Sequence, residues 1–95
     1  MTNWNVEDRE FWVSGNLEAN GEQYIYEIML TKVPSKLGVF SGRVIFLNLF
    51  DSQDQLIAEY DKKWIIAPEK GTVAYKLVSQ ILKENNFRRK EKRSA

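Results

Sequence analysis

The side chains best suited to chemistry or recognition fall in and near the segment from Tyr60 to Trp64. Asp61 and Trp64 lie there three residues apart, and Arg43 lies upstream. A tryptophan ring offers a large contact area, an arginine offers a two-pronged donor, and an aspartate can orient that donor. Arg43, Asp61 and Trp64 are therefore a candidate site for a ligand or a protein partner.

The same residues also have a purely structural interpretation. Trp64 would cap the core where strand gives way to helix, and Asp61 would pair with Arg43. A tryptophan in so small a domain usually belongs to the core, which favours this structural interpretation.

Enzyme chemistry is not expected from this chain. Its 95 residues contain no Cys and no His, which removes thiolate sites, the commonest general base and the commonest zinc ligand. The carboxylates Asp51, Asp54, Glu59 and Asp61 show no spacing typical of metal ligands or of an acid–base pair. The sequence therefore predicts a non-catalytic protein with no cofactor and no metal.

Gly38 and Gly42 flank a loop whose backbone N–H groups could approach an anion. Their spacing does not match a dinucleotide-binding or phosphate-binding loop, and no helix follows directly. We expect instead that both glycines occupy turn positions with positive φ.

A second candidate site is the basic run near the end of the sequence. It consists of Arg88, Arg89, Lys90, Lys92 and Arg93. Such a run can bind phosphate backbones without sequence preference and in a salt-sensitive way. Aromatic side chains on the sheet, such as Trp12 or Tyr24, could then stack on bases. The competing interpretation is a solubilising terminal segment.

The elements that must position these residues begin with strands. Residues 11–18 and 23–32 alternate apolar and polar side chains on either side of Asn20-Gly21, which is a strong hairpin signal. A third strand is predicted from residue 42 or 43 to residue 50, and a fourth over residues 55–65.

The third of these strands is apolar on both faces. Its alternating sets are Val44, Phe46 and Phe50 against Ile45, Leu47 and Leu49. A strand with this pattern is either central with both faces covered, or presents its second face to a partner.

One amphipathic helix completes the pattern. It is predicted from about Pro68 to Asn86, or from Thr72 if Gly71 delays its start. Four antiparallel strands in a meander, with this helix packed on one face, make a two-layer α+β domain. A small β-barrel with the same C-terminal helix is the alternative, because short strands can curl to remove their edges.

Length and charge divide the chain into three parts. A chain of 95 residues is one domain, which we place at residues 10–86. Residues 1–9 form an acidic N-terminal segment, and residues 87–95 form a basic tail that we expect to be disordered. The polar start and the short apolar runs predict neither a signal peptide nor a membrane span, and hence a cytoplasmic protein.

Two segments together resemble a known family. Residues 35–43 follow the pattern S-x-x-G-V-x-x-G-R, and residues 60–68 follow Y-D-x-x-W-x-x-x-P. This pairing resembles a family of small uncharacterised proteins of Gram-positive bacteria, their phages and mobile elements. The resemblance implies a β-meander with a helix and a mobile-element setting, and it implies no activity.

The leading functional hypothesis is a non-catalytic protein-interaction module. Its motivating feature is the two-sided apolar strand at residues 44–50, which could bind a protein partner or form a homodimer. Weak, sequence-independent nucleic-acid binding through the basic tail is the alternative. A small-ligand site at Arg43, Asp61 and Trp64 is the third hypothesis.

Overall fold

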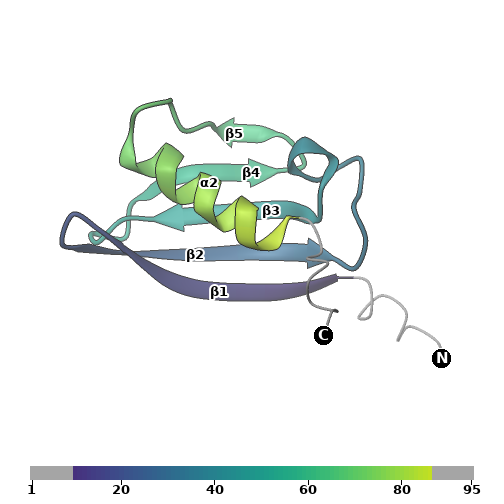
Figure 1. The fold of residues 1–95 in the computed structure, drawn as a ribbon, viewed down its shortest axis with the longest axis horizontal. Helices are drawn as coiled ribbons and strands as arrows, with labels where there is room; N and C mark the ends of the chain where they lie inside the picture. Colours follow the sequence, from purple (N-terminus) through teal and green to yellow (C-terminus); the bar gives the residue numbers. More distant parts are fainter. Residues whose placement is uncertain (1–9, 87–95) are drawn as a thin grey trace.

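A computed structural model of the chain describes residues 10–86 (Figure 1). The elements follow one another as β1 (Glu10–Ala19), β2 (Glu22–Thr31), a short 3-10 turn (Val39–Ser41), β3 (Val44–Phe50), β4 (Leu56–Asp61), β5 (Trp64–Ile66) and α2 (Val73–Asn85). The predicted acidic segment at residues 1–9 and basic tail at residues 87–95 lie outside the described residues.

The strands form one open antiparallel sheet in the order β1-β2-β3-β4-β5. Every strand pairs with its neighbour along the chain, so β1 and β5 are the two edges. The predicted α+β meander with one C-terminal helix is confirmed (Figure 1). The sheet is open rather than closed, so the barrel alternative is wrong.

The sheet has five strands rather than the predicted four. A tight turn splits the predicted fourth strand, because Lys62 adopts a φ of 66° and the Asp61 N–H donates to the Lys63 carbonyl at 2.9 Å. This turn contains neither a glycine nor a proline, so the sequence pattern predicts one continuous strand across it.

The first hairpin forms as predicted. Asn20 and Gly21 have φ values of 52° and 81°, which is the conformation that a two-residue turn with the right twist requires. The turn fixes the register of β1 on β2, from Glu10 opposite Thr31 to Ala19 opposite Glu22.

Helix α2 begins later than Pro68. Thr72 is its N-cap, and the Thr72 hydroxyl accepts a hydrogen bond from the Tyr75 N–H at 3.2 Å. Gly71 just before it has a φ of 89°. The later of the two predicted starts is therefore confirmed, and so is the predicted stop, because Asn86 is the C-cap.

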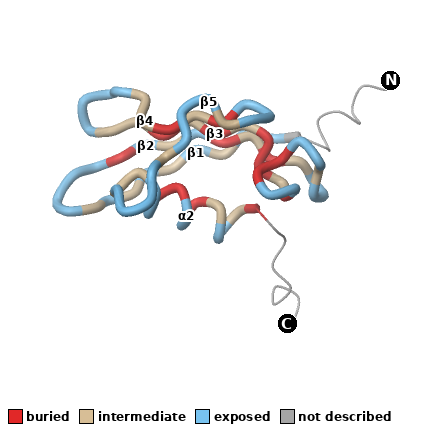
Figure 2. Tube along the Cα trace, turned by 90° about the horizontal axis from the view of Figure 1, so that it is seen from above, coloured by how far each residue is buried: buried red, intermediate tan, exposed pale blue. Residues whose placement is uncertain are grey.

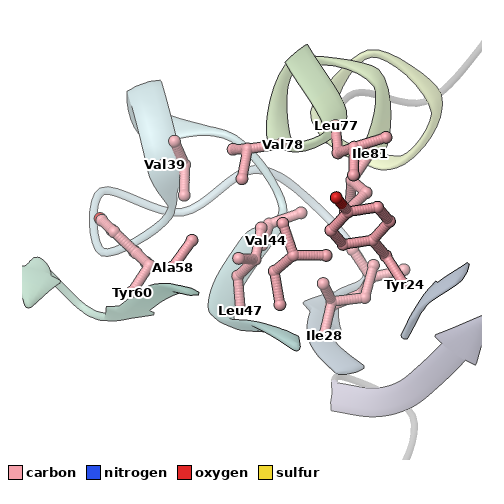
Figure 3. Close-up of a cluster of buried hydrophobic side chains, with 12 residues drawn as sticks. Tyr24, Ile28, Val39, Val44, Leu47, Ala58, Tyr60, Leu77, Val78 and Ile81 are labelled. Atoms are coloured by element: carbon pink, nitrogen blue, oxygen red, sulfur yellow. The ribbon is translucent and has the colours of Figure 1, made fainter. Parts of the chain in front are cut away.

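The hydrophobic core lies between α2 and one face of the sheet (Figures 2 and 3). Leu77, Val78 and Ile81 of the helix are at most 3% exposed. They pack with Ile28 of β2 and Leu47 of β3 in the same cluster, both fully buried (Figure 3). The amphipathic stripe predicted for the helix is thus the stripe that covers the sheet.

Strand β3 departs from simple alternation at its start. Phe46 lies opposite Met29, but Val44 lies opposite Leu30, so Ile45 is an extra residue in the ladder. This bulge turns Val44 to the helix side with Leu47 and Leu49, contrary to the predicted grouping of Val44 with Phe46 and Phe50. Phe46 and Phe50 are left on the face that turns away from α2, which we call the open face.

Candidate functional site

Arg43 lies where the end of β2, the start of β3 and the end of α2 meet. Its Nε donates to the Thr31 carbonyl at 2.8 Å, and its Nη1 donates to the Asn85 carbonyl at 3.5 Å. Its guanidinium carbon lies 5.9 Å from the centre of the Phe11 ring. A cation at the C-terminal end of a helix is favourable because the free carbonyls there carry partial negative charge.

Asp61 and Trp64 lie on opposite faces of the sheet. Asp61 pairs across the ladder with Phe46, on the open face, and its side chain is exposed. Trp64 pairs with Tyr60, on the helix side, and the two rings meet edge to face with centres 5.0 Å apart. A single ligand would have to reach both faces to touch Arg43, Asp61 and Trp64 together.

Tyr60 anchors the Y-D-x-x-W segment to the first loop. Its hydroxyl donates to the Leu37 carbonyl at 2.9 Å, and only 7% of the side chain is exposed. Burial raises the pKa of the Tyr60 hydroxyl above its usual value, because the charged phenolate is disfavoured away from water. The segment therefore joins strand β4 to the loop that follows β2.

Residues 35–43 and Asn86 form a closed structural unit, which we call the clasp. The Asn86 side chain is 2% exposed; its Oδ1 accepts from the Val44 N–H at 3.0 Å and its Nδ2 donates to the Val39 carbonyl at 2.7 Å. Its carbonyl also accepts from the Arg43 N–H at 2.7 Å. The clasp thus ties the end of α2 to the start of β3.

The two glycines of the clasp are needed for space. A Cβ at Gly42 would overlap the Asn86 side chain, and a Cβ at Gly38 would overlap the Gly42 carbonyl. Neither has positive φ: Gly38 has φ −81° and Gly42 has φ −102°. The prediction of positive φ at these glycines is wrong, and Phe40 and Ser41 between them adopt it instead, with φ of 52° and 58°.

A small apolar cleft of about 130 Å³ lies beside Trp64. Its walls include Phe40, Pro68 and Tyr75, and the Phe40 ring is 78% exposed. Arg43 and Asp61 do not line this cleft. Of the three residues singled out in the sequence, only Trp64 therefore faces a hollow here.

The open face presents cross-strand rows of side chains. One row runs Trp12, Met29, Phe46 and Asp61, from β1 to β4. Another row runs Asn16, Ile25, Phe50 and Leu56 across the same strands. Both rows are predominantly apolar, and Trp12 and Ile25 are 57% and 44% exposed.

A polar row separates these two apolar rows. It runs Ser14, Glu27, Asn48 and Glu59, from β1 to β4. Asn48 Oδ1 is buried and has no hydrogen-bond partner, the one such side-chain atom among the described residues. Buried polar atoms are usually paired, so this oxygen marks a place where the folded chain leaves an acceptor unused.

Trp12 is fixed in place on the open face. Its ring meets Phe46 edge to face with centres 5.2 Å apart, reaching across the intervening strand β2. Edge-to-face packing fixes an aromatic side chain without burying it. The sequence singled this residue out as an aromatic that could stack on bases, but the alternation of residues 11–18 does not distinguish an exposed anchor from a solvated position.

Two shallow hollows flank Glu27 on this face. The larger, of about 340 Å³, is lined by Trp12, Val13, Ser14 and Glu27. The other, of about 250 Å³, is lined by Ile25, Glu27, Phe50 and Asp54. Each hollow combines an aromatic ring with a carboxylate.

The predicted nucleic-acid site falls in part outside the described residues. Arg88, Arg89, Lys90, Lys92 and Arg93 lie there, so the tail hypothesis stays a prediction. Tyr24 is only 8% exposed in the core and offers no face for stacking. Trp12 is accessible, but it neighbours Glu27 rather than a basic surface.

Neither a metal site nor a spanning helix is found in the described part of the chain. Among residues 10–86, no three acidic side chains gather closely enough to hold a metal ion. The helices of that segment are also too short or too polar to cross a membrane.

Comparison with known proteins places the domain in a family without supplying an activity. Residues 11–86 match the model of a family described as a domain of unknown function, DUF7678, and the chain belongs to that family. No curated protein and no solved structure matches the chain significantly. The sequence-based expectation of an uncharacterised family is therefore confirmed, and the match leaves host, phage origin and motif pattern untested.

Proposed function

We propose that this member of a family without an assigned activity is a non-catalytic protein-interaction module, which binds a protein partner through the open face of its sheet. The observation that carries the proposal is Trp12, which is held against Phe46 yet 57% exposed. Tryptophan is among the residues that most often dominate binding energy at protein interfaces.

The rest of the open face supports a protein partner rather than a small ligand. Ile25 and Ile66 add apolar area at 44% and 37% exposure. The two hollows beside Glu27 are shallow and open, whereas small-molecule sites enclose most of their ligand. A broad surface with an exposed aromatic anchor and a polar component is typical of protein interfaces.

Within residues 10–86, the helix covers the other side of the sheet only (Figure 2). Antiparallel sheets commonly expose one face to water, but such faces are then mostly polar. Here the open face carries five large apolar side chains, those of Trp12, Ile25, Met29, Phe46 and Phe50. The apolar content is what a partner would cover.

The setting is part of the same proposal. The S-x-x-G-V-x-x-G-R and Y-D-x-x-W-x-x-x-P patterns resemble proteins of phages and mobile elements, and the lack of cysteine suits the cytoplasm. Phage or transfer genes beside the coding gene would support this setting, and a conserved housekeeping neighbourhood would contradict it.

Site-specific photo-crosslinking tests the interaction. A photoreactive amino acid is placed at Trp12, and in a matched control at Glu84, which is exposed on α2. Both proteins are produced in the native host and irradiated. We expect discrete protein adducts at position 12 and none at position 84.

The masses of the adducts separate the alternatives. An adduct of twice the chain mass identifies a homodimer, and any other mass identifies a different partner. Adducts of equal yield at both positions, or none at position 12, would contradict binding through the open face.

A further inference from the structure

Basic residues and the acidic residues of the open face lie in different parts of the domain. Among residues 10–86, no strand contains a Lys or an Arg: these residues lie in the turns, in the clasp and on α2. The acidic residues of the open face, in contrast, lie within the strands themselves, at Glu18, Glu27, Glu59 and Asp61. The face therefore presents negative charge and apolar surface together.

The centre of that face holds hydrogen-bond acceptors side by side. Glu27 and Glu59 flank Asn48 on the neighbouring strands, and Asn48 Oδ1 has no partner. Neighbouring strands lie about 5 Å apart, so Glu27 and Glu59, on either side of Asn48, are about 10 Å apart on one surface. A cation that binds over Asn48 lies between the two carboxylates and is attracted by both.

The hollows on either side of Glu27 suit one type of side chain. In each, an aromatic wall stands beside a carboxylate: Trp12 with Glu27, and Phe50 with Glu27 and Asp54. Lysine and arginine have an apolar stem and a cationic head, and the head also binds favourably over an aromatic ring. Volumes of about 340 and 250 Å³ leave room for such a side chain in each hollow.

We infer that the partner of the open face presents lysine or arginine side chains that enter the hollows beside Glu27. This inference rests on the proposed function and specifies its partner. A second copy of the chain fits poorly as the partner. Two open faces packed together would place carboxylates opposite carboxylates, and the strands of residues 10–86 supply no lysine or arginine to pair with them. Lys62 and Lys63 lie in the β4–β5 turn, next to Asp61, so the binding region is centred on Glu27 rather than on Asp61.

The test uses small probes that isolate one side chain. N-acetyl-arginine amide and N-acetyl-lysine amide are titrated into the labelled full-length protein and followed by NMR. N-acetyl-norleucine amide has a similar apolar stem without the charge and serves as the control probe. We expect shifts of the Trp12 indole N–H and of the Ser14 and Glu27 amides with the basic probes only.

Matched variants assign the effect to one carboxylate. Glu27→Gln keeps the size of the side chain and removes its charge, whereas Glu84→Gln does the same on the exposed side of α2. We expect about tenfold weaker binding of N-acetyl-arginine amide to the Glu27 variant, as for the loss of one charge-assisted hydrogen bond. Binding to the Glu84 variant should not change, and both variants should keep the native spectrum.

The outcomes separate this inference from the proposed function. Equal shifts with the norleucine probe, or unchanged binding after Glu27→Gln, would overturn the basic-partner inference while crosslinking at Trp12 could still succeed. Failure of crosslinking at Trp12 would overturn the proposed function whatever the probes do. An adduct with nucleic acid in place of protein at position 12 would overturn both.

Discussion

The clasp and the open face lie at opposite sides of the same sheet and differ in the hydrogen bonding of their buried polar atoms. In the clasp, the Asn86 side chain uses both ends of its amide, donating to Val39 and accepting from Val44. On the open face, the Asn48 side chain leaves a buried oxygen without a partner. Paired buried groups stabilise a fold, whereas an unpaired one costs stability and often marks a functional site.

Most residues of the two sequence motifs lie on the structural side of this comparison. Gly38, Gly42 and Arg43 build the clasp, and Tyr60 joins it through the Leu37 carbonyl. Asp61 is the one residue specified by these two patterns that lies on the open face. A recognisable pattern in a short chain can therefore report how the fold is closed rather than what the protein binds.

A substitution at Gly42 in the clasp should destabilise the fold most. Gly42→Ala places a methyl group on the buried Asn86 side chain, and overpacking together with lost hydrogen bonds should lower the free energy of unfolding by about 3 kcal/mol. Urea denaturation measures this change. Ser14→Ala on the open face is the control and should stay within about 0.5 kcal/mol of the parent protein.

Asn86→Ala should have the next largest effect. It leaves the Val44 N–H and the Val39 carbonyl without their partner, at a cost of about 2 kcal/mol. Asn85→Ala is the matched control, because within residues 10–86 the Asn85 side chain bonds to the Ile81 carbonyl of its own helix alone, and it should change stability by less than about 0.5 kcal/mol.

Combining the two clasp variants tests whether Gly42 and Asn86 act through the same contact. In the Asn86→Ala background, the methyl group of Gly42→Ala no longer meets the amide, so its cost should fall by at least half. Strictly additive costs would show that the glycine and the asparagine act independently, contrary to the geometry.

Asn48→Val should act in the opposite direction. It removes the unpartnered oxygen and places a β-branched residue in the middle of β3, so we expect a gain of about 1 kcal/mol in the free energy of unfolding. Thermal unfolding measures it. A loss of stability would show that Asn48 already has a partner in solution.

Trp12→Ser should have the smallest effect on stability. It removes one edge-to-face contact with Phe46 from an exposed position, worth about 0.5 kcal/mol. If the open face is an interface, the same change should abolish partner binding, as measured by pull-down with the crosslinked partner. A large loss of stability with intact binding would instead place Trp12 among the structural residues.

Local signals account for the parts of the fold that were predicted. Asn20-Gly21 specifies its hairpin, and the spacing of Leu77, Val78 and Ile81 specifies the buried stripe of α2. The β4–β5 turn was missed because Lys62 adopts positive φ without a glycine. No sequence signal marks the β-bulge at Ile45 either, so the orientation of Val44 toward the helix could not be predicted.

The candidate site was harder to predict than the fold. Asp61 and Trp64 are close in sequence, but the intervening turn and the pleat send them to opposite faces. Trp12, Glu27 and Asn48 come from three strands, and only the strand register brings them together. The sequence did indicate that Phe46 and Phe50 share an apolar face that could remain uncovered.

The meander has a consequence for synthesis on the ribosome. Each strand pairs only with its neighbour along the chain, so the sheet can assemble hairpin by hairpin as the chain emerges. Its apolar side gains its cover last, because α2 and Asn86, which bonds back across 42 and 47 residues, are made after every strand. Until then the nascent sheet is apolar on both surfaces, and a chaperone or the eventual partner has its best opportunity to bind.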